Sequence, residues 1–364
     1  MSAEPAHFDA LFIGDPAPWF RQRCIGQDAA FSFDTAAGRF IALCFYGGAS
    51  EAEARRALGM MQAHQGLFDG SRRCLFGVSG DPADEADTTL SPRAGVRHFA
   101  DADGVVARAF GMAPRQGAPD LAVLRRGWLV LDPRLRLVAA FPLDEAGGRA
   151  AMRYLESLPP PALYFGEAPA PVLLVPHVFE PEFCARLVQA HQADGGEDSP
   201  VLTEGGAVRD HAFKSRTDWR IADQTLAAQV QARIFRRVVT EIRHAFQFEA
   251  TRMERLVVAC YDAEAGGRFG PHRDNTVAAS AHRRFAVSLN LNDDFEGGGI
   301  VFPEYSGRAF RPAAGAALVF SCSLMHAVVP VTRGRRFACL PFLYDEAAAD
   351  LRRGSSAARP PGGT

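Results

Sequence analysis

The chain has 364 residues, with 40 basic and 42 acidic side chains and a formal net charge of -2. This balance provides no broad positive surface, which disfavours nucleic acid or an anionic membrane as a partner. The start has no basic segment followed by an apolar stretch, and no later run has the length of a membrane span, so we expect a cytoplasmic protein. Two domains are expected at this length.

Short apolar runs alternate with helix-forming segments in the first half of the chain. We expect strands at residues 40–46, 73–79 and 128–131, and helices at 51–66 and 144–157. This alternation predicts a layered α/β domain with a largely parallel sheet. The pattern stops at the prolines of residues 159–161, so we place the two domains at residues 1–160 and 165–346.

Helical periodicity opens the second half. Residues 180–193 carry apolar side chains on one face, which predicts an amphipathic helix. A second helix is predicted from apolar residues that repeat every four positions, namely Leu226, Val230, Ile234, Val238 and Ile242. The segment between them, residues 200–220, contains glycine and charges of both signs. We interpret it as a loop near the mouth of a site, with its charged side chains in solvent.

Strands broken by glycine follow these helices. They are expected at residues 255–261, 283–292, 299–305, 316–322 and 335–344. Several short, closely spaced strands favour a double-sheet β fold such as a jelly roll. The tail at residues 347–364 lacks apolar periodicity and is small, polar and proline-rich, so we predict that it is disordered.

Three residues in the second half have the types and spacing of a non-haem iron site. Two imidazoles and one carboxylate on one face of the metal leave its other positions open. His272 and Asp274 are two positions apart, so an extended backbone directs both side chains to the same side. His326 follows an apolar run and would bring a ligand from a second strand. Each pattern alone arises by chance, and only their combination in this order is specific.

Arg336 is the residue expected to bind a carboxylate. It follows His326 by ten positions and lies on the next expected strand, after a turn at Thr332–Gly334. A buried guanidinium pairs bidentately with a carboxylate group. The neighbouring Arg335 should point the other way, because side chains alternate along a strand.

The sequence from Tyr261 to Tyr344 resembles the prolyl-4-hydroxylase-like branch of the 2-oxoglutarate/Fe(II) dioxygenases. The matching pieces are ACY followed by HRDN, then SLNLNDDFEGGGIVFPE, and then HAVVPVTRGRR. Upstream, VLLVPHVFEPEFCARLVQAH resembles the family's entry strand and first helix, so the resemblance extends over roughly residues 165–346. It implies a double-stranded β-helix.

The resemblance also implies roles for individual residues. Fe(II) would be bound by His272, Asp274 and His326, and the 2-oxoglutarate carboxylate by Arg336. Tyr261 matches a family tyrosine near the co-substrate, although an ordinary core tyrosine explains the pattern equally well. One departure is Asn290, which stands where the family often has a tyrosine that binds the co-substrate. Its amide could donate a similar bond, and Ser288 shares its face of the strand.

The activity implied is hydroxylation of a C–H bond with O2, while 2-oxoglutarate yields succinate and CO2. Ascorbate is the reductant that the resemblance suggests. A prolyl residue of a protein or peptide is the prominent substrate in the family. A free amino acid or another small molecule is the alternative, because the fold does not decide between them.

The first half resembles peroxiredoxins and thioredoxin-like proteins over about residues 12–158. The matching pieces are IGDPAPWF, GRFIALCFYG, LFGVSGDPADEAD, HFADADGVVARAFGM and RGWLVLD. That family places its reactive cysteine at the start of the helix after the second piece, where the helix N-terminus and an arginine activate the thiol. The corresponding stretch here, YGGASEAEARRAL, has no cysteine and instead carries Glu51 and Glu53.

No cysteine stands at the catalytic position. Cys44 lies within a strand and Cys24 in a loop, and Arg126 has no thiol to activate. We therefore predict a module for packing, homodimerisation or substrate capture. All seven cysteines are expected to be buried thiols without disulfides. A thiol peroxidase and a non-catalytic interaction protein are the alternatives to a dioxygenase.

Overall fold

The computed structural model describes residues 9–115, 124–166, 168–203 and 206–357, with side chains up to residue 353. The chain divides into two compact units, one made of Met1–Ala168 with Pro303–Ser306 and the other of Pro169–Phe302 with Gly307–Thr364. The domain limits of 1–160 and 165–346 stay predictions. No helix among the described residues has both the length and the apolar character needed to cross a membrane.

The first unit is built on a five-stranded sheet with the strand order β5-β4-β3-β6-β7. Its strands are β3 (Phe40–Gly47), β4 (Arg73–Ser79), β5 (Val96–Ala100), β6 (Gly127–Leu131) and β7 (Leu137–Pro142). β3, β4 and β5 pair in parallel, whereas β6 and β7 are antiparallel. The central strand β3 is buried along its whole length, as its continuous apolar run predicts. A separate hairpin joins β1 (Arg21–Arg23) to β2 (Ala30–Ser32).

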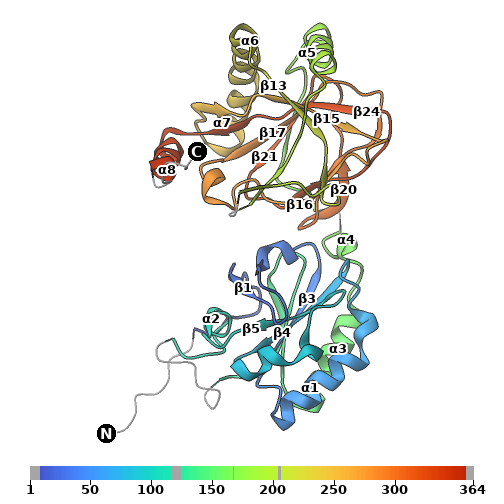
Figure 1. Cartoon of the computed structure of the whole chain (residues 1–364), viewed down its shortest axis with the longest axis vertical. Coiled ribbons are helices and arrows are strands. Elements are labelled where there is room, and N and C mark those ends of the chain that lie inside the picture. The colour runs from blue at the N-terminus through green and yellow to red at the C-terminus, as the bar shows by residue number, and fades with distance from the viewer. Residues whose placement is uncertain (1–8, 116–123, 167, 204–205, 358–364) are drawn as a thin grey trace. The chain divides into compact units, whose positions relative to one another are not determined.

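Helices cover this sheet. They are α1 (Ala52–Ala63), α2 (Val105–Ala109), α3 (Glu145–Ser157) and α4 (Pro161–Tyr164), with short 3-10 turns η1 (Phe33–Ala36), η2 (Gln65–Leu67), η3 (Pro82–Ala86) and η4 (Thr88–Leu90). Figure 1 shows α1 and α3 on the same side of the sheet, where Met61 and Met152 share one core cluster with Phe40. The predicted α/β thioredoxin-like fold is confirmed, including its three central strands and its two longer helices. The sheet is mixed and not largely parallel as predicted, because β6 and β7 pair in the antiparallel direction.

The second unit contains a large sheet with the order β14-β25-β17-β24-β15-β13-β9, extended from β17 through β21 to β8. The strands are β8 (Leu173–Val175), β9 (Glu197–Asp198), β13 (Thr217–Arg220), β14 (Arg252–Glu254), β15 (Val257–Asp262), β17 (Phe285–Asn290), β21 (Ala317–Ser321), β24 (Arg335–Cys339) and β25 (Phe342–Tyr344). All pairs in it are antiparallel. The predicted strands of the second half thus lie in one sheet, with the exception of residues 299–305.

The second unit also contains a smaller sheet of five strands. Its order is β12 (Lys214–Ser215), β16 (Arg268–His272), β22 (His326–Val328), β19 (Ile300–Phe302) and β20 (Ser306–Phe310). Two pairs of strands lie outside both sheets, β10 (Val201–Thr203) with β11 (Gly206–Val208), and β18 (Glu296–Gly297) with β23 (Val331–Arg333). The two-sheet arrangement confirms the predicted jelly roll.

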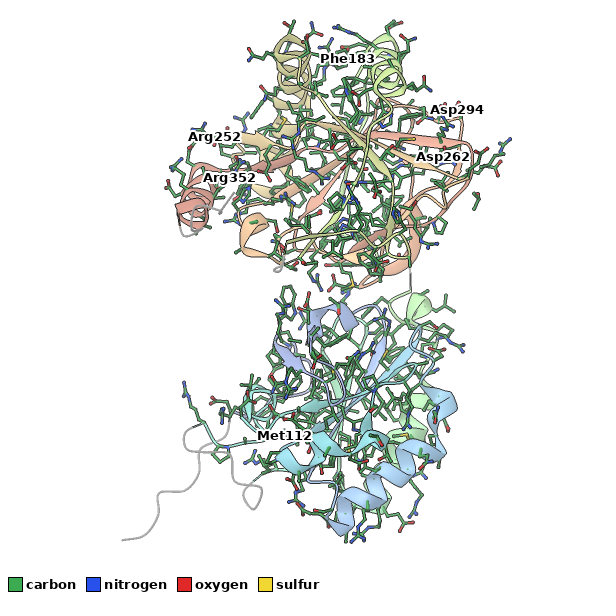
Figure 2. All side chains as sticks on the ribbon, viewed as in Figure 1. Met112, Phe183, Arg252, Asp262, Asp294 and Arg352 are labelled. Atoms are coloured by element: carbon green, nitrogen blue, oxygen red, sulfur yellow. The ribbon has the colours of Figure 1, made fainter. Side chains whose placement is uncertain are left out.

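Helices pack on the large sheet (Figure 1). They are α5 (Pro181–Asp194), α6 (Gln224–Ile234), the π-helical turn η6 (Phe235–Val239) and α7 (Thr240–Phe246), with a 3-10 turn η7 (Ala278–Ser280) further along. The five apolar residues that predicted the second helix are all buried in one core cluster. Phe183 of α5, labelled in Figure 2, belongs to the same cluster. These helices therefore share a core with the large sheet.

Two predictions about loops and disorder were wrong for the described residues. Residues 346–357 form helix α8 (Glu346–Ala357), where we expected disorder, because Ala348 and Ala349 are buried beside Tyr344. The rest of that tail, residues 358–364, lies outside the described residues. The segment 200–220, expected as a loop, contains four short strands, since its residues pair with β15 and β16. Each of the seven cysteines is a buried free thiol, as predicted.

Candidate metal centre

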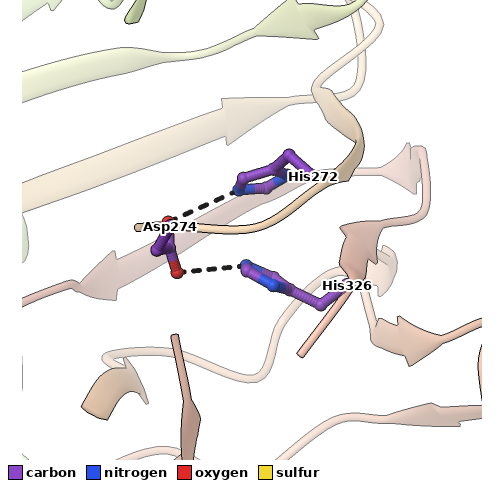
Figure 3. Close-up of side chains that lie close together, drawn as sticks. All are labelled: His272, Asp274 and His326. Atoms are coloured by element: carbon purple, nitrogen blue, oxygen red, sulfur yellow. Dashed lines mark ion pairs between the residues drawn. The ribbon is translucent and has the colours of Figure 1, made fainter. Parts of the chain in front are cut away.

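His272, Asp274 and His326 converge in the second unit. His272 is the last residue of β16 and His326 the first of β22, and the two are cross-strand partners in the small sheet. Their Nε2 atoms lie 3.6 Å and 3.4 Å from the two carboxylate oxygens of Asp274 (Figure 3). One ligand atom from each residue falls within 4.8 Å of the others, the arrangement that could hold a metal ion. The sequence prediction that these three residues meet is confirmed.

Backbone carbonyls fix the orientation of both imidazoles. The Nδ1 atom of His272 lies 2.8 Å from the carbonyl oxygen of Gly270, and that of His326 lies 3.0 Å from the carbonyl of Leu324. Each Nδ1–H can therefore donate to a carbonyl, which leaves the Nε2 lone pair directed at the shared centre. Such outer hydrogen bonds select the tautomer that binds a metal.

Charge and burial prepare Asp274 and His326 to act as ligands. Burial acts to raise the pKa of Asp274, but the adjacent His326 and His272 hold it well below its usual range. Burial and His272 lower the pKa of His326 to about 4. Both groups are thus deprotonated at neutral pH, the state that metal binding requires. Arg283 donates to the backbone carbonyl of Asp274 at 3.3 Å and supports the turn that carries the carboxylate.

Arg336 lies on β24 of the large sheet and is only 1% exposed. Its Nε donates to Asn290 Oδ1 at 3.0 Å and its Nη2 to Ser288 Oγ at 2.8 Å. Its Nη1 is buried and has no hydrogen-bond partner within the part of the chain that the structure describes. Burial lowers its pKa to about 10, so the guanidinium stays charged at neutral pH. A buried cation with neutral partners and a free donor is one that an incoming carboxylate would stabilise.

The side chain of Arg335 points away from this pocket, as predicted. It is 55% exposed and forms an ion pair with Asp262, a residue labelled in Figure 2. Arg335 and Asp262 also line a cavity of about 690 Å³, to which Arg216 contributes as well.

Tyr261 and Asn290 take different positions at the site. Tyr261 is the cross-strand partner of Arg336 and is 1% exposed, with the Arg336 guanidinium 5.3 Å from its ring. The two amide atoms of Asn290 are both used within the protein, since Oδ1 accepts from Arg336 and Nδ2 donates to the carbonyl of Pro312 at 2.7 Å. Asn290 therefore holds Arg336 in place, and its amide donor, which we expected to face a co-substrate, is directed at the backbone.

A group of buried basic and acidic side chains beside these residues was not predicted from the sequence. Lys214 and Arg216 are 4% and 6% exposed, contrary to the solvated loop that we expected. Arg216 Nη1 donates to the Tyr261 hydroxyl at 2.7 Å, and its Nε lies 2.9 Å from Asp218. The Lys214 ammonium lies 4.9 Å from the ring of Phe269, which stacks on His272. The alternation of Lys214, Arg216 and Asp218 at every second position was the signal in the sequence.

In the first unit, an ion pair lies where the sequence resemblance would have placed a reactive cysteine. Glu51, directly before α1, pairs with Arg126 through two contacts, one of them 2.8 Å between Nη2 and Oε1. Burial raises the pKa of the Cys24 thiol to about 11 and that of Cys44 well above its usual range. Thiols of this kind stay protonated and unreactive at neutral pH.

Comparison with known proteins supports this description of the second unit. Residues 256–344 match the family model of the 2OG-Fe(II) oxygenase superfamily. A PKHD-type hydroxylase from Stutzerimonas stutzeri is 26% identical over 192 residues, which cover 50% of this chain and 82% of that protein. A PKHD-type hydroxylase from Synechococcus sp. is 30% identical over 95 residues, or 24% of this chain and 42% of that protein. This chain thus spans about two fifths of the length of the Synechococcus relative and about four fifths of the length of the Stutzerimonas one.

Solved structures resemble each half. A prolyl hydroxylase from Trichoplax adhaerens, in complex with a peptide of hypoxia inducible factor, has a TM-score of 0.41 and 17% identity, covering 50% of this chain and 86% of that one. The bacterioferritin comigratory protein of Xanthomonas campestris has a TM-score of 0.32 and 20% identity, covering 38% and 90%. The fold assignments rest on the sheet topologies above. The family assignment rests on the match of residues 256–344 to the family model. The C-terminal region of this chain carries a 2OG-Fe(II) oxygenase domain.

Proposed function

We propose that the C-terminal domain is an Fe(II)- and 2-oxoglutarate-dependent dioxygenase that hydroxylates a C–H bond. The observation that carries this proposal is the pairing of two prepared features, the metal-ligating triad and the unpartnered Nη1 of the buried Arg336. The first suits a divalent cation and the second a carboxylate. A 2-oxo dicarboxylic acid has a 2-oxo carboxylate end that can bind the metal and a second carboxylate that can bind the guanidinium.

The donor set fits iron. Two imidazoles and one carboxylate on one side of a metal are typical of non-haem Fe(II) oxygenases, whose open positions admit co-substrate and oxygen. His272 and His326 would bind through Nε2, and Asp274 through its carboxylate. No fourth His, Cys, Asp or Glu joins this group among the described residues, so it does not close the coordination sphere as a structural zinc site would.

When bound, iron, 2-oxoglutarate and O2 supply the oxidising chemistry, with succinate and CO2 as the products and ascorbate as a reductant of the metal. The residues of the chain would hold the metal and orient the co-substrate. Arg336 Nη1 would bind the far carboxylate of the co-substrate, while Asn290 and Ser288 fix the guanidinium. The Tyr261 hydroxyl would donate a second bond to it. Burial of these groups excludes water and strengthens each charge-assisted bond.

The substrate we favour is a prolyl residue in a protein or peptide. This rests on the resemblance of residues 261–344 to the prolyl-4-hydroxylase-like branch and on curated relatives named PKHD-type hydroxylases. A free amino acid is the second candidate, because the same iron chemistry serves both classes. The first unit would act in packing, homodimerisation or substrate capture, since its redox position holds the Glu51–Arg126 ion pair.

Incubation with Fe(II), 2-oxoglutarate, ascorbate and O2 tests the substrate class. Proline-containing peptides and free amino acids are compared as substrates, and succinate and a product heavier by one oxygen atom are measured by mass spectrometry. We expect both products with peptides, and neither with the Asp274→Ala variant. Hydroxylation of free amino acids alone would reject the peptide as substrate. Absence of 2-oxoglutarate binding to the iron-loaded protein would reject the proposed function.

A further inference from the structure

Arg216 connects the two sheets of the second unit. It lies between β12 of the small sheet and β13 of the large sheet, and its side chain is 3% exposed. Its Nη1 donates to the hydroxyl of Tyr261 at 2.7 Å. Its guanidinium carbon lies 5.5 Å from the centre of the Tyr261 ring, and that of Arg336 lies 5.3 Å from the same centre. Tyr261 therefore has two guanidinium groups against it, one from β24 and one from the residue between β12 and β13.

The two arginines differ in their charge partners. Arg216 Nε lies 2.9 Å from Asp218 Oδ1, and its Nη2 donates to Asp218 Oδ2 at 3.1 Å. Asp218 also accepts from Ser199 Oγ at 2.6 Å and pairs with Arg255 at 2.7 Å. For Arg336 no carboxylate lies within ion-pair distance among the described residues. Arg216 thus has a carboxylate partner, which it shares with Arg255, whereas Arg336 has none among the described residues.

The bond from Arg216 also sets the direction of the Tyr261 hydroxyl. A guanidinium has no acceptor, so the phenolic oxygen must accept this bond. The hydroxyl proton of Tyr261 is then available for a different acceptor. Because Arg336 lies against the same ring, an acceptor bound to the free Nη1 of Arg336 is close to Tyr261. A carboxylate there could accept from both.

We propose that Arg216 and Asp218 are positioning residues of the co-substrate pocket. Arg216 orients the Tyr261 hydroxyl as a donor to the co-substrate carboxylate, and Asp218 compensates Arg216 so that the carboxylate binds at Arg336 instead. This inference rests on the proposed function, and it extends the pocket to two residues on a segment that shares no strand with the metal ligands or with Arg336.

Binding of 2-oxoglutarate, measured by calorimetry on the full chain with Mn(II) in place of Fe(II), tests the inference without turnover. Arg216→Met should weaken 2-oxoglutarate binding about 10-fold, the effect of losing one hydrogen bond to a charged ligand. The control is Arg335→Met, which removes the same side chain next to Arg336 on the outer face, where it pairs with Asp262. It should leave the affinity for 2-oxoglutarate unchanged, and both variants should bind Mn(II) as the wild type does.

A double-mutant cycle distinguishes positioning through Tyr261 from general support of the fold. If Arg216 acts through the hydroxyl, Arg216→Met should weaken binding about 10-fold in the wild type but less than 3-fold in the Tyr261→Phe background. Equal losses in both backgrounds would overturn the inference, as would a loss no larger than that of Arg335→Met. Arg216→Lys, which keeps a donor and the charge, should restore part of the affinity and covers the case in which Arg216→Met fails to fold.

Asp218→Asn tests the second half of the inference. Without its carboxylate partner the Arg216 guanidinium can bind a carboxylate itself, so we expect the preference for 2-oxoglutarate over the shorter oxaloacetate to fall several-fold. The matched control, Asp262→Asn, should leave this preference unchanged. An unchanged preference in Asp218→Asn would overturn the role of Asp218. A wild-type protein that binds Mn(II) but no 2-oxoglutarate would reject the proposed function, and the inference with it.

Discussion

The two units of this protein both resemble enzymes, yet their charged residues are arranged in opposite ways. In the first unit Arg126 has a carboxylate partner, Glu51, which lies directly before helix α1. In the second unit Arg336 is buried, has only neutral partners and keeps one donor free. The first arrangement is electrostatically complete, whereas the second leaves a buried donor without a partner among the described residues.

The difference between the two arginines indicates where a ligand is expected. A buried charge without a partner costs folding free energy, so its presence points to a group that binds there. The metal-ligating triad supports the same conclusion, because three ligand groups converge and two of them have their tautomers fixed. The Glu51–Arg126 pair shows the reverse, a site whose charges compensate one another. The following predictions test this difference.

Loss of a metal ligand should have the largest effect. In His272→Ala, one of three ligands is missing, so we expect the affinity for Fe(II) to fall by roughly a hundredfold or more. Iron content after anaerobic reconstitution and desalting measures this directly. The exposed residue His244 provides the control, and His244→Ala should retain full iron. Stoichiometric iron in His272→Ala would show that the triad is not the metal site.

Removal of the unpaired guanidinium should have the next largest effect. Arg336→Met eliminates both the positive charge and the Nη1 donor that would bind the co-substrate carboxylate, so 2-oxoglutarate binding should weaken by about 100-fold while Fe(II) binding is retained. The variant should also be no less stable than the wild type, because it removes a buried, uncompensated charge. Retained co-substrate affinity would place the carboxylate elsewhere. A titration of 2-oxoglutarate and a thermal melt suffice.

The buried Lys214 should make the difference in melting temperature between Lys214→Met and the wild type depend on pH, by a few degrees. Burial lowers its pKa from 10.5 to about 6, so the unfolded chain holds the proton more tightly than the folded one. The cost of burying Lys214 is therefore complete below pH 6 and fades as the pH rises towards 10.5. The melting temperature of Lys214→Met relative to the wild type should be higher at pH 6 than at pH 9 by a few degrees. The same difference at both pH values would contradict the shift.

The smallest effect is expected in the first unit. Cys24→Ser and Cys44→Ser should leave any consumption of peroxide by the full chain unchanged, because both thiols are buried and protonated. Peroxide consumption in a coupled assay with a thiol reductant measures this. A thiol-dependent rate that either substitution abolishes would show that the unit is a working peroxidase.

The sequence was sufficient to predict the features that depend on local order. The continuous apolar run of β3 and the spacing of His272 and Asp274 each require only a few neighbouring residues, and both predictions hold in the structure. The alternation of side chains along β24 likewise predicted that Arg336 points inward and Arg335 outward, although strand β23 occupies most of the turn expected before it. Features set by such short-range patterns transfer directly from residues to structure.

What could not be predicted depends on partners far away in the chain. Arg216 and Asp218 lie in a segment with charges of both signs, which indicates a solvated loop unless its pairing with β15 is known. Asn290 binds Arg336 across 46 positions, so its role as a support could not be read from its own strand. Helix α8 was missed because Ala348 and Ala349 are weakly apolar and gain their packing only beside Tyr344.

The most direct test of the central claim is an anaerobic titration of the Fe(II)-loaded protein with 2-oxoglutarate, followed by visible absorption. Chelation of the 2-oxo acid by iron predicts a weak charge-transfer band in the wild type, which His272→Ala lacks and which Arg336→Met shows only at about 100-fold higher 2-oxoglutarate. A wild-type protein that holds iron yet develops no band at any concentration would contradict the account.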